Sequence, residues 1–134
     1  MSNEEKLEMI TSYIKGNVAP LLIENISSDI FTRNAVILPA DIDMKELDGH
    51  YEEINFLPPN WYQELQKYKE DNYCFLVISE LSNLPKEEQL KFGEILKYKK
   101  VGVFDLPKNC VIIITGRNIK ETISKEIYSM VAAI

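Results

Sequence analysis

The sequence contains few residues whose types and spacing could carry out chemistry. His50 is the single histidine, and it lies in an acidic loop, residues 48–53, far along the chain from either cysteine. A Ser-His-Asp or Cys-His arrangement would depend on that histidine. Cys74 and Cys110 each begin or enter an apolar run without C-x-x-C spacing, which favours buried, inert thiols in a reducing compartment. We therefore expect no catalytic residues of the nucleophilic kind.

The spacing typical of metal and phosphate sites is also missing from the sequence. Cysteines, histidine and carboxylates nowhere match a zinc site, and Asp41-Ile42-Asp43 lacks the glycine and closing glutamate of a calcium loop. A phosphate-binding G-x-x-x-x-G-K-[ST] loop cannot form, because no glycine precedes a lysine. The glycines are Gly16, Gly49, Gly93, Gly102 and Gly116. We expect no bound metal and no cofactor.

Length and composition are those of one globular domain. The 134 residues, 46% hydrophobic and 27% charged, are sufficient to form a single core over residues 1–134. The net charge of −6 argues mildly against a general nucleic-acid binder, although it leaves room for a local basic patch. An acidic start and the lack of a bilayer-spanning apolar stretch predict a cytoplasmic protein without membrane association. The oligomeric state is not indicated.

Alternating helix and strand signals predict the elements that would position any site. Helical spacing or start signals mark residues 3–15, 61–69 and 86–97, and a closing helix carries Ile119, Ile123, Ile127 and Val131. Continuous apolar runs at 20–23, 35–38, 73–78 and 110–115 indicate buried strands, and residues 100–107 alternate like a hairpin. The pattern predicts a three-layer α/β domain with a mostly parallel sheet of about four strands and helices on both faces.

Several segments, in the same order along the chain, resemble the core of MoxR-like AAA+ ATPases. Residues 56–61 (FLPPNW) are similar to the family's "W-L-P-P-E-W" segment, and residues 75–85 (FLVISELSNLP) to its Walker B strand and turn. Residues 38–49 and 89–109 also resemble family stretches, and 111–116 (VIIITG) resembles the sensor-1 strand. The resemblance spans roughly residues 20–118 and implies a P-loop NTPase fold, with strand 73–79 between strands 110–115 and 35–38.

The sequence departs from the family where nucleotide would bind. Eleven residues, 24–34, separate the first two strands. A crossover connection alone needs roughly ten to twelve residues, so a phosphate loop followed by a helix does not fit, and the segment has room for a single short helical turn. Ser79 replaces the acid that would hold Mg²⁺, and a neutral hydroxyl is a poor ligand for it. Glu80 matches the residue that orients the attacking water, or is simply a polar residue ending a central strand. Arg117 and Asn118 fall at the sensor-1 position.

The resemblance therefore implies a degenerate, truncated core in which Ser79, Glu80, Arg117 and Asn118 are vestiges. The sequence ends before the lid domain of the family, and the segment 124–134 lacks its finger arginine. A base without a metal or a phosphate cradle cannot supply the electrostatic stabilisation that phosphoryl transfer needs. We expect that the protein is not an enzyme.

Aromatic and basic residues suggest a surface for a partner. Trp61 follows two prolines and is close in sequence to Phe56 and Tyr62, and rigid aromatics of this kind are typical binding anchors. Alternatively, Trp61 packs a helix onto the sheet. Lys99, Lys100 and Phe104 of the expected hairpin complete the candidate set, although the lysines of this stretch could equally form a solvated face.

These observations favour a non-catalytic interaction module that binds a protein partner, such as a true AAA+ ATPase or a ring subunit. One alternative is an accessory factor that associates with nucleic acid through the Lys-rich helix and hairpin. Another is a nucleotide-binding ATPase with an unconventional phosphate site.

Overall fold

The computed structural model describes residues 3–16 and 19–133 and shows a three-layer α/β domain. Its main sheet has five strands in the order β2 (Ala35–Pro39), β5 (Cys74–Ser79), β8 (Cys110–Gly116), β1 (Leu21–Glu24) and β9 (Ala132–Ala133). Every neighbouring pair in this sheet is parallel. The predicted placement of the strand at 73–79 between those at 110–115 and 35–38 is confirmed. The expected count of about four strands was one too low.

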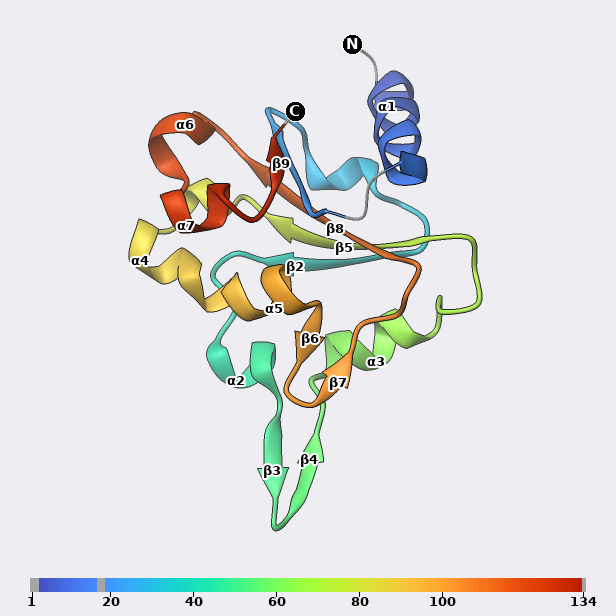
Figure 1. The fold of residues 1–134 in the computed structure, drawn as a ribbon, viewed down its shortest axis with the longest axis vertical. Helices are drawn as coiled ribbons and strands as arrows, with labels where there is room; N and C mark the ends of the chain where they lie inside the picture. Colours follow the sequence, from blue (N-terminus) through green and yellow to red (C-terminus); the bar gives the residue numbers. More distant parts are fainter. Residues whose placement is uncertain (1–2, 17–18, 134) are drawn as a thin grey trace.

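Helical segments cover both faces of the sheet (Figure 1). On one face, Ile10 of α1 (Asn3–Gly16) and Ile30 of the 3-10 turn η1 (Ser28–Ile30) pack against Phe75 and Val77. On the other face, α2 (Met44–Asp48), α3 (Asn60–Gln66) and α5 (Gly93–Tyr98) pack against Leu76 and Ile78. Successive residues of a strand point to opposite faces, so the continuous apolar run in β5 serves both layers.

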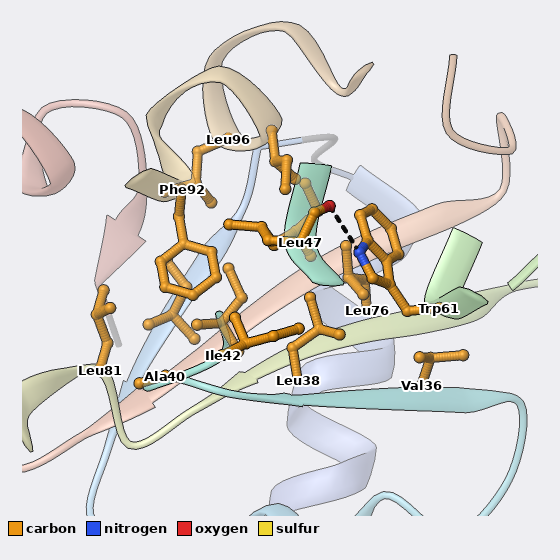
Figure 2. Packing of buried hydrophobic residues seen from close by; sticks show 14 of the residues in the cluster. Val36, Leu38, Ala40, Ile42, Leu47, Trp61, Leu76, Leu81, Phe92 and Leu96 are labelled. Atoms are coloured by element: carbon orange, nitrogen blue, oxygen red, sulfur yellow. Dashed lines mark hydrogen bonds between the residues drawn. The ribbon is translucent and has the colours of Figure 1, made fainter. Parts of the chain in front are cut away.

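The second core holds Trp61, which sequence reasoning left as either an anchor or a packing residue. The Trp61 side chain is 5% exposed, and its indole N–H donates to the Leu47 carbonyl at 2.9 Å. Figure 2 shows the indole lying among Leu47, Val36 and Leu76, so this side chain joins α3 to α2 and the sheet. The helix expected at 61–69 begins one residue earlier and ends at Gln66. Trp61 is a core residue and does not itself form a surface anchor.

Helical structure after β5 is more broken than the sequence predicts. The helix expected from Lys86 to about Lys97 consists of α4 (Lys86–Gln89), the 3-10 turn η3 (Leu90–Phe92) and α5. A 3-10 turn, η2 (Leu81–Asn83), precedes them. Within the described residues, no helix is long and apolar enough to cross a membrane.

The closing helix predicted through Val131 is wrong. The chain instead forms α6 (Ile119–Thr122), α7 (Lys125–Tyr128) and strand β9. The break has a local cause, because Ser124 is the N-cap of α7 and its hydroxyl accepts from the Ile127 N–H at 3.2 Å. The buried Gln89 side chain accepts from the Ser124 N–H at 2.8 Å and donates to the Thr122 carbonyl at 2.7 Å. Beyond α7, Ala132 N–H donates to the Pro20 carbonyl at 2.8 Å and adds the fifth strand.

Two small antiparallel hairpins stand apart from the main sheet. One pairs β6 (Lys100–Val101) with β7 (Phe104–Asp105), as the sequence predicts. The other pairs β3 (His50–Glu52) with β4 (Asn55–Leu57), where the sequence indicated an acidic loop. Figure 1 shows β3 and β4 projecting from the body of the domain, on the side of the sheet away from α1.

Candidate functional site

The carboxyl edge of the main sheet is the first place to look for a site. In parallel α/β sheets, ligands bind beyond the carboxyl ends of the strands. Strands β1, β5 and β8 end there at Glu24, Ser79 and Gly116. The structure therefore brings the predicted vestigial residues Ser79, Glu80, Arg117 and Asn118 to one edge, because they end or directly follow adjacent parallel strands.

Side chains from three segments bond to one another at this edge. The Ser28 hydroxyl of η1 donates to the Ser79 hydroxyl at 2.7 Å and lies 3.5 Å from the Thr115 hydroxyl oxygen. The Thr115 hydroxyl accepts from the Glu80 N–H at 2.9 Å, and both Ser28 and Thr115 are buried. The short turn that the sequence allows between β1 and β2 thus lies against the ends of β5 and β8.

The polar groups on the β1 side of the edge are also engaged. Glu24 accepts from the Ile119 N–H at 3.0 Å through its carboxylate, and Asn25 N–H donates to the Gly116 carbonyl at 3.0 Å. Arg117 N–H donates to the Ser82 hydroxyl at 2.9 Å. The Glu24 carboxylate at the start of α6 and the hydrogen-bonded turn at Asn25 are poor surroundings for an anionic phosphate, because a phosphate needs free N–H groups and positive potential.

Glu80 and Asn118 share an uncommon backbone conformation. Their φ angles are 58° and 50°, in the left-handed region that non-glycine residues adopt at some cost. Glu80 is half-buried at the end of β5, whereas Arg117 and Asn118 are exposed. Among the described residues, no group of three or more His, Cys, Asp or Glu side chains could hold a metal ion. The edge is thus built from polar side chains, several of which bond to one another.

The two cysteines lie opposite each other on β5 and β8. Cys74 and Cys110 are paired in register, and both are buried as free thiols. A hydrogen bond from the Cys110 thiol lowers the pKa of Cys74, and the same contact together with burial raises the pKa of Cys110. Their place in the core agrees with the interpretation of the two as structural thiols.

The second candidate site is a cluster of aromatic rings that joins the two hairpins and α3. Phe56 of β4 stacks on Phe104 of β7 with ring centroids 5.8 Å apart, and Tyr62 of α3 also lies 5.8 Å from Phe104. Tyr51 of β3 lies 5.2 Å from Phe56, and the Tyr62 hydroxyl donates to the Asp105 carbonyl at 2.8 Å. We call this cluster, together with Ile54 and Val103 of the two hairpin turns, the hairpin platform.

Close packing fixes the two hairpins against each other. Gly102 has a φ of +59°, and a Cβ at this position would lie 2.5 Å from the Phe56 ring. Gly49, just before β3, has a φ of +74°, and a Cβ there would lie 2.4 Å from the Leu57 carbonyl. An isolated two-stranded hairpin is marginal in water, so the contact between Phe56 and Gly102 supports β3 and β4 from the second hairpin.

The platform is apolar and exposed. Ile54, Val103 and Tyr51 are 91%, 68% and 65% exposed, and Phe104 is exposed as well. Single exposed apolar residues are ordinary, whereas large exposed apolar patches are common at interaction sites. Three of the predicted partner-binding residues, Phe56, Tyr62 and Phe104, therefore meet at one surface. Sequence reasoning missed Tyr51, Ile54 and Val103, although the alternation of β3 and β4 could have indicated a second hairpin.

The two predicted lysines make local contacts beside this platform. Lys100 forms an ion pair with Asp105 at 3.6 Å, and the Lys99 ammonium donates to the Cys110 carbonyl at 3.0 Å. Asp105 and burial raise the pKa of Tyr62, with burial the larger cause. Glu52 and Glu53 of the other hairpin are exposed, so the charges around the platform are mixed and not a continuous basic patch.

Comparisons with known proteins show similarity in fold and not in sequence. No protein-family model matches the chain, and no curated protein matches it. A closed-state cryo-EM reconstruction of Hsp104 with ATPγS and FITC-casein matches with a TM-score of 0.61 at 8% identity, over 100% of this chain and 33% of that one. A DNA polymerase III, gamma subunit-related protein from Thermotoga maritima matches with a TM-score of 0.56 at 10% identity, over 96% of this chain and 44% of that one.

This chain thus spans a third of the first matching structure and less than half of the second. Likeness at such low identity shows the fold alone. Both matching proteins are AAA+ proteins, which supports the fold that the sequence resemblance implies. The chain has an AAA+-like α/β fold.

Proposed function

We propose that this protein is a non-catalytic, degenerate MoxR-like AAA+ module that binds a protein partner through the hairpin platform. The observation that carries the proposal is the exposed aromatic and apolar cluster joining the two hairpins. Aromatic side chains that are already held in place lose little entropy on binding, and they dominate the energetics of protein interfaces.

The hydrogen bonds among the strand ends at the carboxyl edge support the non-catalytic part of the proposal. The hydroxyls of Ser28, Ser79 and Thr115 engage one another or the Glu80 N–H, in the region where a nucleotide would need a phosphate cradle. We expect the partner to be a true AAA+ ATPase or a ring subunit.

The test is affinity capture from the native host with three forms of the protein, followed by quantitative mass spectrometry. Ile54→Asp combined with Val103→Asp places two charges on the platform at exposed positions, where the fold tolerates them. Leu90→Asp is the matched control, since Leu90 is also exposed but lies on η3, outside the platform.

We expect the native protein and Leu90→Asp to capture the same partner and the double variant to lose at least nine-tenths of it. Equal capture by the double variant would place the interface elsewhere. A captured set without any protein in common between the native form and the control would argue against a specific partner.

A further inference from the structure

Strand β2 forms one edge of the main sheet, and its outer side carries unused backbone groups. β2 pairs with β5 alone. Phe75 N–H donates to the Asn34 carbonyl at 2.7 Å, and Ala40 N–H donates to the Ser79 carbonyl at 3.1 Å. Hydrogen bonds in a parallel ladder come from every second residue of a strand. Val36 and Leu38 therefore bond to β5, while the peptide groups of Ala35 and Ile37 point away from the sheet.

These outward groups have no backbone partner in the part of the chain that the structure describes. The open stretch ends at Pro39, which lacks an N–H and whose carbonyl accepts from the Ile42 N–H at 3.0 Å. Folded proteins usually block sheet edges with charges, bulges or a covering segment, because an open edge is a template for another strand. Here only the proline limits the edge, and two N–H and two C=O groups remain available.

An open groove runs beside this edge. It has a volume of about 460 Å³ and is lined by β2 and by residues of α2 and α3, among them Ile37, Lys45, Glu46, Trp61 and Glu64. A second groove, at the carboxyl end of β2, shares Ile37 and Pro39 and adds Asp41 and Glu80. Ile37 lies between the two grooves and is 43% exposed. The edge is thus accessible from both sides.

The charges around the grooves restrict what could bind there. Four carboxylates line them, those of Glu46 and Glu64 on one side and of Asp41 and Glu80 on the other, against the ammonium of Lys45 and the imidazole of His50. None of these carboxylates belongs to an ion pair among the described residues. Two copies of this chain, each with a net charge of −6, would repel each other at this edge.

We propose that β2 accepts an extended, basic segment of a partner protein as a sixth strand. Main-chain hydrogen bonds to Ala35 and Ile37 would supply affinity, as in other cases of strand addition. Lys or Arg side chains at the ends of the segment would face the unpaired carboxylates. This inference does not rest on the proposed function, because the hairpin platform is a different surface.

The probe is a phage-displayed library of nine-residue peptides in which alternating Val, Ile and Thr lie between pairs of Lys or Arg. Peptides selected on the full chain are labelled, and their dissociation constants are measured by fluorescence anisotropy. Ile37→Pro removes the outward N–H without removing a bond to β5, since proline is tolerated at an edge position of this kind. Ile37→Val keeps the N–H and is the matched control.

We expect selected peptides to bind about tenfold more weakly to Ile37→Pro than to Ile37→Val, the loss that one or two hydrogen bonds would cause. Glu46→Lys combined with Glu64→Lys should weaken binding at least as much, and this variant keeps the test decisive if Ile37→Pro does not fold. The amides of Ala35 and Ile37 should exchange more slowly with solvent deuterium when peptide is bound.

Three results would overturn the proposal. The library could yield no enriched peptide, or the enriched peptides could bind Ile37→Pro as tightly as the control. Peptides with two central prolines could also bind equally well, which would show attraction between charges without strand addition. The platform variant Ile54→Asp with Val103→Asp should leave peptide affinity unchanged, so failure here and failure of the proposed function are separable.

Discussion

At the scale of single residues, Thr115 links two strand ends of the carboxyl edge. Its hydroxyl accepts the Glu80 N–H at 2.9 Å and lies near Ser28, and the threonine itself is fully buried. The Glu80 N–H directly follows β5 and is accepted by this side chain, while the left-handed φ of Glu80 turns the chain away from the strand direction. The same position in an active site could serve a ligand, whereas here it serves the fold.

Thr115→Val should destabilise the protein by about 1–3 kcal/mol, because it leaves the Glu80 N–H without its acceptor while conserving volume. Urea unfolding followed by circular dichroism measures the difference. Thr32→Val, at an exposed position of the loop before β2, is the control and should change stability by less than about 0.5 kcal/mol. Equal stability of the two variants would mean that the hydroxyl network contributes nothing.

Trp61 gives a second test at this scale, since its indole is buried and bonded to the Leu47 carbonyl. Trp61→Ala should cost about 3–5 kcal/mol, as expected for a large core side chain. Trp61→Phe keeps most of the packing and should cost less, and it should leave partner capture intact. Partner capture lost in a stably folded Trp61→Phe variant would show that this residue has a role at the interface after all.

At the scale of elements, the two hairpins act as one unit because Phe56 rests on the turn between β6 and β7. Gly102 makes this contact possible, since any Cβ at that position would overlap the Phe56 ring. The stacking of Phe56 on Phe104 continues the contact from the turn to the strand. The geometry of the platform therefore depends on a glycine that is not itself part of the apolar surface.

Gly102→Ala should destabilise the protein by about 1–3 kcal/mol and displace β3 and β4, because it adds both backbone strain and a clash. Thermal melting gives the stability, and the ring-proton shifts of Phe56 and Phe104 report the stacking. Gly93→Ala is the matched control, because the nearest atom to its Cβ would be 3.9 Å away. If both variants retain native ring shifts, the hairpins are not held by this contact.

The sequence predicts the main strands well because they are buried on both faces and appear as continuous apolar runs. It predicts the β3 and β4 hairpin poorly, because the strands have three residues each and the turn uses Glu53 at a φ of 56° in place of a glycine. It also misses the break between α6 and α7. Ile119, Ile123 and Ile127 are all buried, so their helical spacing persists across an interruption that Ser124 and Gln89 impose.

The candidate site, like the fold, is predicted by the sequence only in part. Phe56, Tyr62 and Phe104 were identifiable as aromatic residues near turns, and the structure brings them together. Trp61 has the same chemistry and a similar sequence context, yet it points into the core. Whether an aromatic residue on a short helix faces the sheet or the hairpins depends on tertiary packing, which local sequence does not encode.

At the scale of the whole molecule, an AAA+-like sheet is combined with a short connection between β1 and β2 that packs against the strand ends. That connection holds a single 3-10 turn, η1, whose first residue bonds to the end of β5. A nucleotide placed where Ser28, Ser79 and Thr115 meet would have to displace this turn and break the hydroxyl contacts. We therefore expect the fold to be retained without nucleotide hydrolysis, and partners to bind at the hairpin platform and along β2.

Thermal melting in the presence of millimolar ATP and Mg²⁺ tests this account most directly. A ligand at a hundred times its dissociation constant stabilises a protein by about 2.7 kcal/mol, which would raise the melting temperature by several degrees in a domain of this size. We predict no shift beyond that caused by the same concentration of MgCl₂ with inorganic phosphate, and no release of phosphate from ATP. A reproducible, saturable rise of several degrees with ATP would contradict the account, because it would show that the protein binds a nucleotide.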